Sequence, residues 1–155
     1  MRKVYILLLF SLILITGCEN EEETIKNEYI AMKNQTFNDK NYTDTELPVD
    51  IVTTIERIDE EAINYKVTIS NPKENMNDVK VLVVHNCYNE DVFPSIGVFD
   101  EPQKLLANGD DEEVLVLKDT IKTTKNISKL DLELKILIEY TDDNGEKKDI
   151  YYKTT

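Results

Sequence analysis

The sequence is poor in the residues from which most enzyme sites are built. It has one histidine, two cysteines and four glycines among 155 residues. A single histidine leaves no zinc-protease motif, and the chain holds neither the Gly-x-Ser-x-Gly turn of serine hydrolases nor the glycine-rich loops that bind phosphates and dinucleotides. The sequence therefore predicts a protein that is not an enzyme, with no catalytic residues, no metal ligands and no cofactor.

Positive charge is also scarce. Eighteen Lys and Arg residues stand against 31 Asp and Glu residues, which gives a net charge of −13. Phosphate binding needs clustered Lys and Arg, so the balance argues against nucleic acid as a partner, and equally against docking on anionic lipid headgroups. It is compatible with a solvated acidic surface, a basic partner or loosely held divalent cations.

The N-terminus has the pattern of a secretory signal. Two basic residues, Arg2 and Lys3, precede an apolar run from Val4 to Ile15 that only Ser11 interrupts. The run has the length of a signal-peptide core and is too short to span a bilayer comfortably as a helix. Basic residues in front of it favour retention of that end in the cytoplasm.

Four residues directly after this run are more specific. The tetrapeptide Ile15-Thr16-Gly17-Cys18 resembles the bacterial lipobox, in which an aliphatic residue, a small residue and Gly or Ala precede a cysteine. The resemblance implies that the Cys18 thiol takes a diacylglyceryl group and that a lipoprotein signal peptidase recognises Ile15, Thr16 and Gly17 and removes residues 1–17. The new amino group can be acylated as well, for example with palmitate. Two or more acyl chains anchor stably, so we expect a lipoprotein on the outer face of the cell membrane.

Processing would change the charge and the cysteine count. Loss of Arg2 and Lys3 would leave 16 basic and 31 acidic residues, a net charge of −15. With Cys18 lipidated, Cys87 has no disulfide partner within the chain. We expect Cys87 to be a small buried apolar residue.

Residues 18–48 form the lipidated N-terminus and an acidic tether in this interpretation. Low hydrophobicity with an excess of charge predicts poor packing. Within the segment, Ile25, Tyr29 and Met32 have helical spacing, which indicates a short helix from Glu21 to Lys33. Such a helix is marginal alone, so it either docks on the following domain or frays.

From residue 49 the pattern changes to the alternation of β-strands. The expected strands are Val49–Ile58, Ile63–Ile69, Val79–His85, Ile96–Phe99, Val114–Leu117, Leu130–Tyr140 and Ile150–Tyr152. The third is the most apolar and is expected at the centre of a sheet. Asp142-Asp143-Asn144-Gly145 predicts a tight hairpin. Short strands at close spacing predict an all-β domain, a β-sandwich, over residues 49–155.

Two segments resemble the immunoglobulin-like adhesion modules of prokaryotic surfaces. Tyr65–Pro72 followed by Asn77–Val81 is similar to their B–C region, and Ile138–Gly145 is similar to their last hairpin. The chain has Asn71-Pro72-Lys73 where those modules commonly have an Asn-Thr-Gly turn, so the resemblance concerns the fold. It implies an immunoglobulin-like sandwich that serves as a surface module.

His85 and Cys87 are the first of three candidate sites. They lie two residues apart, on one face of a continuing strand, and with Asp91 they have the chemistry of metal ligands or of a nucleophile pair. However, His85 also continues the inward row of valines from residue 79 to 83. Ordinary strand packing is the interpretation we favour.

The other two candidate sites are loops. Asp110–Glu113 and Asp142–Glu146 are acidic and suit either weak calcium binding or solvated turns, and turns are favoured. The apolar loop Val92–Phe99 is a candidate binding loop through Phe93, Pro94 and Phe99 if these are exposed. Packing inside the sandwich is favoured, because exposed apolar patches are uncommon on monomers.

These observations predict a lipid-anchored, extracytoplasmic and non-enzymatic module that binds an envelope protein or cell-wall component, or that assists a larger envelope system. Two alternatives remain open. One is a small metal-binding protein or enzyme centred on His85 and Cys87. The other is an immunity or inhibitor lipoprotein that faces a basic toxin or hydrolase, which only the charge suggests.

Overall fold

The computed structural model describes residues 21–38, 42–43, 46–88, 92–109 and 114–154. This part of the chain contains one α-helix, eight strands and one 3-10 turn. In chain order they are α2 (Glu21–Asn38), β1 (Asp50–Arg57), β2 (Ala62–Ser70), β3 (Met76–His85), β4 (Ser95–Ile96), β5 (Gln103–Leu105), β6 (Leu115–Lys122), the 3-10 turn Ile127–Lys129, β7 (Leu134–Thr141) and β8 (Lys147–Lys153).

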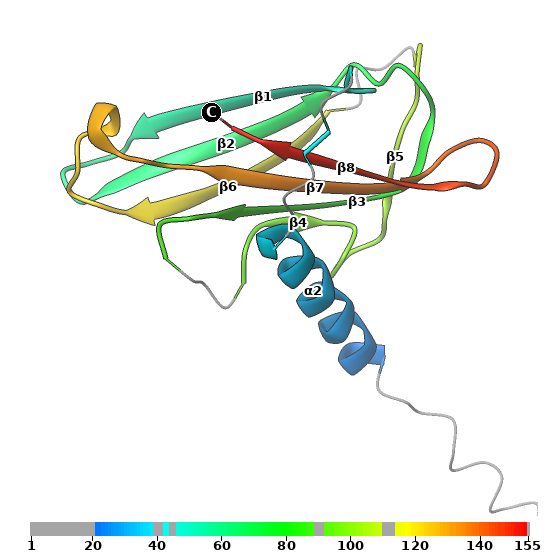
Figure 1. The fold of residues 1–155 in the computed structure, drawn as a ribbon, viewed down its shortest axis with the longest axis horizontal. Coiled ribbons are helices and arrows are strands. Elements are labelled where there is room, and N and C mark those ends of the chain that lie inside the picture. The colour runs from blue at the N-terminus through cyan, green and yellow to red at the C-terminus, as the bar shows by residue number, and fades with distance from the viewer. Residues whose placement is uncertain (1–20, 39–41, 44–45, 89–91, 110–113, 155) are drawn as a thin grey trace, which may run out of the picture.

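The strands form two antiparallel sheets that share one core (Figure 1). A three-stranded sheet has the order β1-β2-β6, and a five-stranded sheet has the order β4-β3-β7-β8 with β5 also paired to β3. Buried side chains from both sheets meet in one cluster, which includes Tyr65, Val81 and Ile136. The prediction of a mostly β domain is therefore confirmed.

Strand β2 shows how the alternating pattern positions the core. Ile63, Tyr65, Val67 and Ile69 are fully buried, while Asn64 and Lys66 between them are exposed. Tyr65 pairs with Ile55 of β1 and with Asp119 of β6. A strand with neighbours on both sides and one apolar face belongs in the middle of a sheet that is solvated on its outer side.

Strand β3 is buried on both faces. Val79, Val81 and Val83 enter the core between the sheets, whereas Leu82 and Val84 belong to a second cluster on the outer face of the five-stranded sheet. β3 pairs with β7 along one edge and with β4 and β5 along the other. Its predicted central position is confirmed.

Helix α2 covers that outer face. Tyr29 and Met32 are buried in the second cluster together with Leu82, Val84 and Leu137. An ion pair between Glu28 and Lys80 holds the helix to β3, and Lys135 Nζ donates to the carbonyl of Phe37 at 2.9 Å. The helix is longer than the expected Glu21–Lys33, and for residues 21–38 the docking alternative holds. The domain boundary at residue 49 stays a prediction, and the helix before it packs against the domain after it.

Several local expectations differ from the structure. β6 extends to Lys122 and β8 begins at Lys147, beyond the expected Val114–Leu117 and Ile150–Tyr152. β7 begins at Leu134 and not at Leu130, because the chain first makes the 3-10 turn, where Leu130 N–H donates to Ile127 at 3.1 Å. β4 covers only two residues, because Gly97 at φ +75° turns the chain so close to β3 that a Cβ would lie 2.5 Å from the Val79 carbonyl oxygen. β5 was not expected, since three residues carry too little periodicity.

The predicted hairpin between β7 and β8 is present. Gly145 has φ +80°, the left-handed region that glycine occupies readily. The Asp142 carboxylate accepts from the backbone N–H groups of Asn144 and Glu146, each at 2.9 Å.

Candidate functional site

The predicted lipidation site lies outside the described residues. Cys18, the recognition residues Ile15, Thr16 and Gly17, and the signal peptide of residues 1–17 therefore stay predictions. What the structure adds is that a folded element, α2, begins at Glu21, three residues after Cys18. Among the described residues, no helix is long and apolar enough to cross a membrane.

The loop Val92–Phe99 is held between α2 and β3. Phe93 is only 1% exposed, its N–H donates to Tyr29 Oη at 2.6 Å, and its ring lies 5.5 Å from that of Phe37. The carbonyl of Pro94, which is half-buried, accepts from Val83 N–H at 3.1 Å. Phe93 and Pro94 are thus packing residues and not exposed binding residues.

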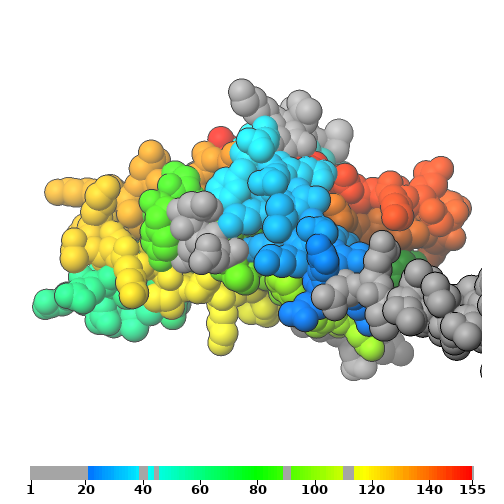
Figure 2. Space-filling view, turned by 90° about the horizontal axis from the view of Figure 1, so that it is seen from below, coloured from blue at the N-terminus to red at the C-terminus, as the bar shows by residue number. Residues whose placement is uncertain are grey.

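Phe99 differs from Phe93. Its side chain is 52% exposed, and its ring lies 4.9 Å from that of Tyr29. Together with Val92 (61% exposed), Ile30 (43% exposed) and half-buried Ile25, it lines a groove of about 740 Å³ between the helix and the loop. We call this the helix–loop groove. In Figure 2, the residues that follow β4 (yellow-green) lie beside the N-terminal turns of α2 (dark blue).

Charged side chains stand around the helix–loop groove. Tyr29 and the charged residues Glu21, Glu22, Lys26 and Lys33 complete its lining, and all five come from α2. The Lys33 ammonium also lies 5.2 Å from the centre of the Phe93 ring. Sequence reasoning found the loop Val92–Phe99 but missed Ile30, because the groove joins the loop to a helix that lies far from it in the sequence.

His85 lies in an aromatic environment at the end of β3. It is 2% exposed, and its ring centre lies 6.0 Å from Tyr65, 5.0 Å from Tyr88 and 5.1 Å from Phe93. The imidazole therefore packs as part of the junction between the sheets and the loop. This placement agrees with the strand-packing interpretation.

Cys87 is half-buried just beyond the end of β3 and packs against the main core. Burial raises the pKa of its thiol, and the charge of Lys125 opposes this only in part. A nucleophilic or metal-binding cysteine needs the opposite shift. Asp91, the third proposed ligand, lies outside the described residues, and among those described no three His, Cys, Asp or Glu residues lie close enough to hold a metal ion.

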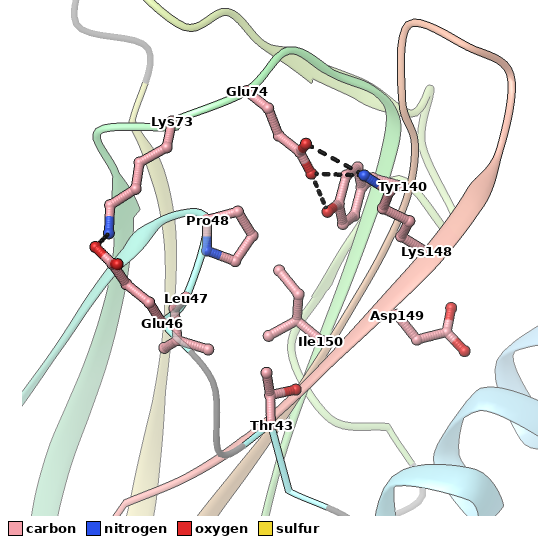
Figure 3. Close-up of a pocket in the computed structure, with 10 residues that line it drawn as sticks. All are labelled: Thr43, Glu46, Leu47, Pro48, Lys73, Glu74, Tyr140, Lys148, Asp149 and Ile150. Carbon is pink, nitrogen blue, oxygen red and sulfur yellow. Dashed lines mark hydrogen bonds and ion pairs between the residues drawn. The ribbon is translucent and has the colours of Figure 1, made fainter.

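A polar pocket lies where the turn before β3 meets the β7–β8 hairpin (Figure 3). Its volume is about 590 Å³. It is lined by Thr43, Glu46, Leu47, Pro48, Lys73, Glu74, Tyr140, Lys148, Asp149 and Ile150.

Charged groups in this pocket are paired with one another. The Glu74 carboxylate accepts from Tyr140 Oη at 2.5 Å and from Lys148 Nζ at 3.1 Å, and Lys148 also contacts Asp142 at 3.1 Å. The hydrogen bond from Tyr140 is the main reason that the pKa of Glu74 lies below its usual range. Burial, followed by the bond to Glu74, raises the pKa of Tyr140, and the carboxylates raise that of Lys148.

These shifts indicate a structural role for the pocket. The Glu74 carboxylate accepts from both Tyr140 and Lys148, which favours the protonated form of each. The network instead ties the hairpin to the turn before β3. Asp142 turns inward with 7% exposure, and the N–H of Glu146 lowers its pKa. Its carboxylate caps the turn of the hairpin. The other acidic loop, Asp110–Glu113, lies outside the described residues.

We predict that Glu74 contributes to the dependence of stability on pH. Its pKa is lowered on folding, so its contribution is present above the ordinary carboxyl range and is lost as the pH falls through the lowered pKa. The free energy of unfolding of the unaltered chain should therefore fall between about pH 5 and pH 3, and Glu74→Gln should reduce that slope. Urea unfolding at several pH values measures it. The control is Glu101→Gln, at an exposed loop position. If the free energy of unfolding of the Glu74→Gln protein fell with pH as steeply as that of the unaltered chain, the role of Glu74 would be contradicted.

We predict a large difference between the two phenylalanines of the loop. Phe93→Ala removes a buried ring from the cluster under α2 and should cost about 3–5 kcal/mol of unfolding free energy. Phe99→Ala removes a half-exposed ring and should cost about 1 kcal/mol or less. Urea unfolding followed by circular dichroism measures both. Equal losses would show that the loop does not pack as described.

Comparisons with known proteins do not place the chain in a family. No family model matches it, and no curated protein or solved structure matches it significantly.

Proposed function

We propose that this chain is a lipid-anchored lipoprotein of the cell envelope, cut before Cys18 and held on the outer face of the cell membrane. The observation that carries the proposal is the tetrapeptide Ile15-Thr16-Gly17-Cys18 directly after a basic start and an apolar run of signal-peptide length. In this proposal the folded body is a non-enzymatic binding or accessory module, with an envelope protein or a cell-wall component as its partner.

The position of α2 supports a close attachment. Only Glu19 and Asn20 separate Cys18 from Glu21, and the three residue steps between them reach about 10 Å at most. The helix that follows is packed on the five-stranded sheet through Tyr29 and Met32. In the mature protein, the lipid would therefore hold the folded body near the bilayer and not at the end of a long tether.

We further propose that the two sheets form an immunoglobulin-like sandwich. The strand orders β1-β2-β6 and β4-β3-β7-β8 correspond to A-B-E and C′-C-F-G in such modules. The chain crosses from the first sheet to the second after β2, as it does between strands B and C. Because this fold hosts many unrelated functions, it supports a surface module only by analogy.

The chemistry of the candidate residues supports a non-enzymatic role. The Cys87 thiol has a raised pKa, and Tyr140 and Lys148 are held protonated by Glu74. His85 is enclosed by aromatic rings. Each of these groups has a packing or clamping role that accounts for its position.

Replacement of Cys18 tests the anchoring. We expect Cys18→Ala, expressed in a bacterial host, to abolish labelling with radioactive palmitate and to release the protein from the membrane fraction or stall it as a precursor, because no thiol remains to be alkylated. Cys87→Ala is the matched control and should keep both label and membrane association. A Cys18→Ala protein that is still acyl-labelled in the membrane would refute the proposal.

A further inference from the structure

The helix–loop groove is lined by apolar side chains that are partly exposed to solvent. Ile30, Val92 and Phe99 are each between 43% and 61% exposed, and they come from two segments that the hydrogen bond from Phe93 N–H to Tyr29 Oη holds together. The apolar residues thus belong to one fixed surface. Exposed apolar surface that is ordered in this way marks a site of contact with a partner or a membrane.

The distance between Cys18 and the groove indicates whether the groove contacts a protein partner or the membrane. Ile25, the first apolar residue of the groove, is four residues into α2, about 6 Å along the helix axis. Adding the reach from Cys18 to Glu21, the groove begins within about 16 Å of the lipidated residue. A lipidated Cys18 lies at the surface of the bilayer, so the groove is the apolar surface that the anchor brings closest to lipid.

The position of the helix leaves this surface accessible. Residues 21–24, 26 and 27 are exposed, and Figure 1 shows the N-terminal turns of α2 extending past the five-stranded sheet. The residues buried by docking, Tyr29, Met32 and Thr36, begin only at the ninth of the 18 residues of the helix. The flank that lines the groove therefore has no other element of the described structure over it.

The charged residues around the groove indicate which force would draw it to a lipid surface. Glu21 and Glu22 oppose Lys26 and Lys33, so the rim has no net charge. The whole chain is strongly acidic. Attraction to anionic headgroups is thus excluded as the driving force, and the apolar side chains must supply it.

We propose that the helix–loop groove rests on the outer leaflet of the bilayer that holds the anchor, with Phe99, Val92 and Ile30 inserted at the level of the headgroups and upper acyl chains. This inference rests on the proposed lipidation of Cys18. Aromatic and branched apolar residues suit this interface, into which apolar faces sink by about 5–10 Å. The contact fixes the orientation of the body, with the three-stranded sheet on the side away from the membrane.

The chain contains no tryptophan, which permits a site-specific fluorescence test. Lipidated Phe99→Trp protein is purified in detergent, reconstituted into neutral phosphatidylcholine vesicles and recovered by flotation. The control is Val52→Trp, at an exposed position of similar accessibility on the outer face of β1. Both proteins are measured in ordinary vesicles and in vesicles whose acyl chains carry bromine, a short-range quencher, near the glycerol.

We expect the Phe99→Trp emission to shift to shorter wavelength on reconstitution and to lose intensity in brominated vesicles, while the Val52→Trp emission changes in neither respect. The protein could float with the vesicles while residue 99 is not quenched, or while residue 52 is quenched equally. Either result would overturn the membrane contact of the groove and leave the lipid anchoring intact. A blue shift without quenching would place residue 99 in an apolar contact other than lipid and would equally overturn the proposal. Protein that does not float would refute the anchoring, and the membrane contact with it.

Discussion

The structure depends on burying both faces of strand β3. Its inner valines fill the core between the sheets, while Leu82 and Val84 on its other face would meet water if the sandwich stood alone. Helix α2 and the ring of Phe93 cover them. Each such side chain stabilises by roughly 1.5–3 kcal/mol when fully buried. The layer therefore contributes several kcal/mol, a large share of the net stability of about 5–15 kcal/mol that is usual for a domain.

The same requirement ties the N-terminal segment to the folded body. Because α2 is needed as a cover, residues 21–38 belong to the packed structure and are not a free linker. The same contacts order the loop, since Tyr29 accepts from Phe93 N–H and stacks against Phe99. One element thus covers the sheet, orders the loop and, with Val92 and Phe99, displays partly exposed apolar side chains.

Much of the fold was predictable because it follows from local periodicity. The alternation of Ile63, Tyr65, Val67 and Ile69 identified β2, and Asn144-Gly145 identified the last hairpin. Helical spacing of Ile25, Tyr29 and Met32 identified α2 but not its docking. The sequence did contain one indication of the docking. Leu82 and Val84 are apolar, and they lie on the face of β3 that a two-layer sandwich alone would leave exposed.

The candidate sites were harder to predict because they depend on distant segments. Phe93 and Phe99 are equally apolar in sequence, and only the position of α2 makes one buried and the other half-exposed. The clamp of Glu74, Tyr140 and Lys148 joins residues up to 74 positions apart. No spacing rule along the chain relates such residues, so their pairing emerges only when the sheets are assembled.

Amide hydrogen exchange measures directly whether α2 is docked on the five-stranded sheet. An isolated 18-residue helix of this polar composition would open constantly and exchange fast. Docked as described, the amides of residues 29–37 should exchange nearly as slowly as those of β3, and Met32→Asp should release them selectively. Fast exchange throughout α2 in the unaltered protein, with β3 fully protected, would show that the helix is a free tether and would contradict the account.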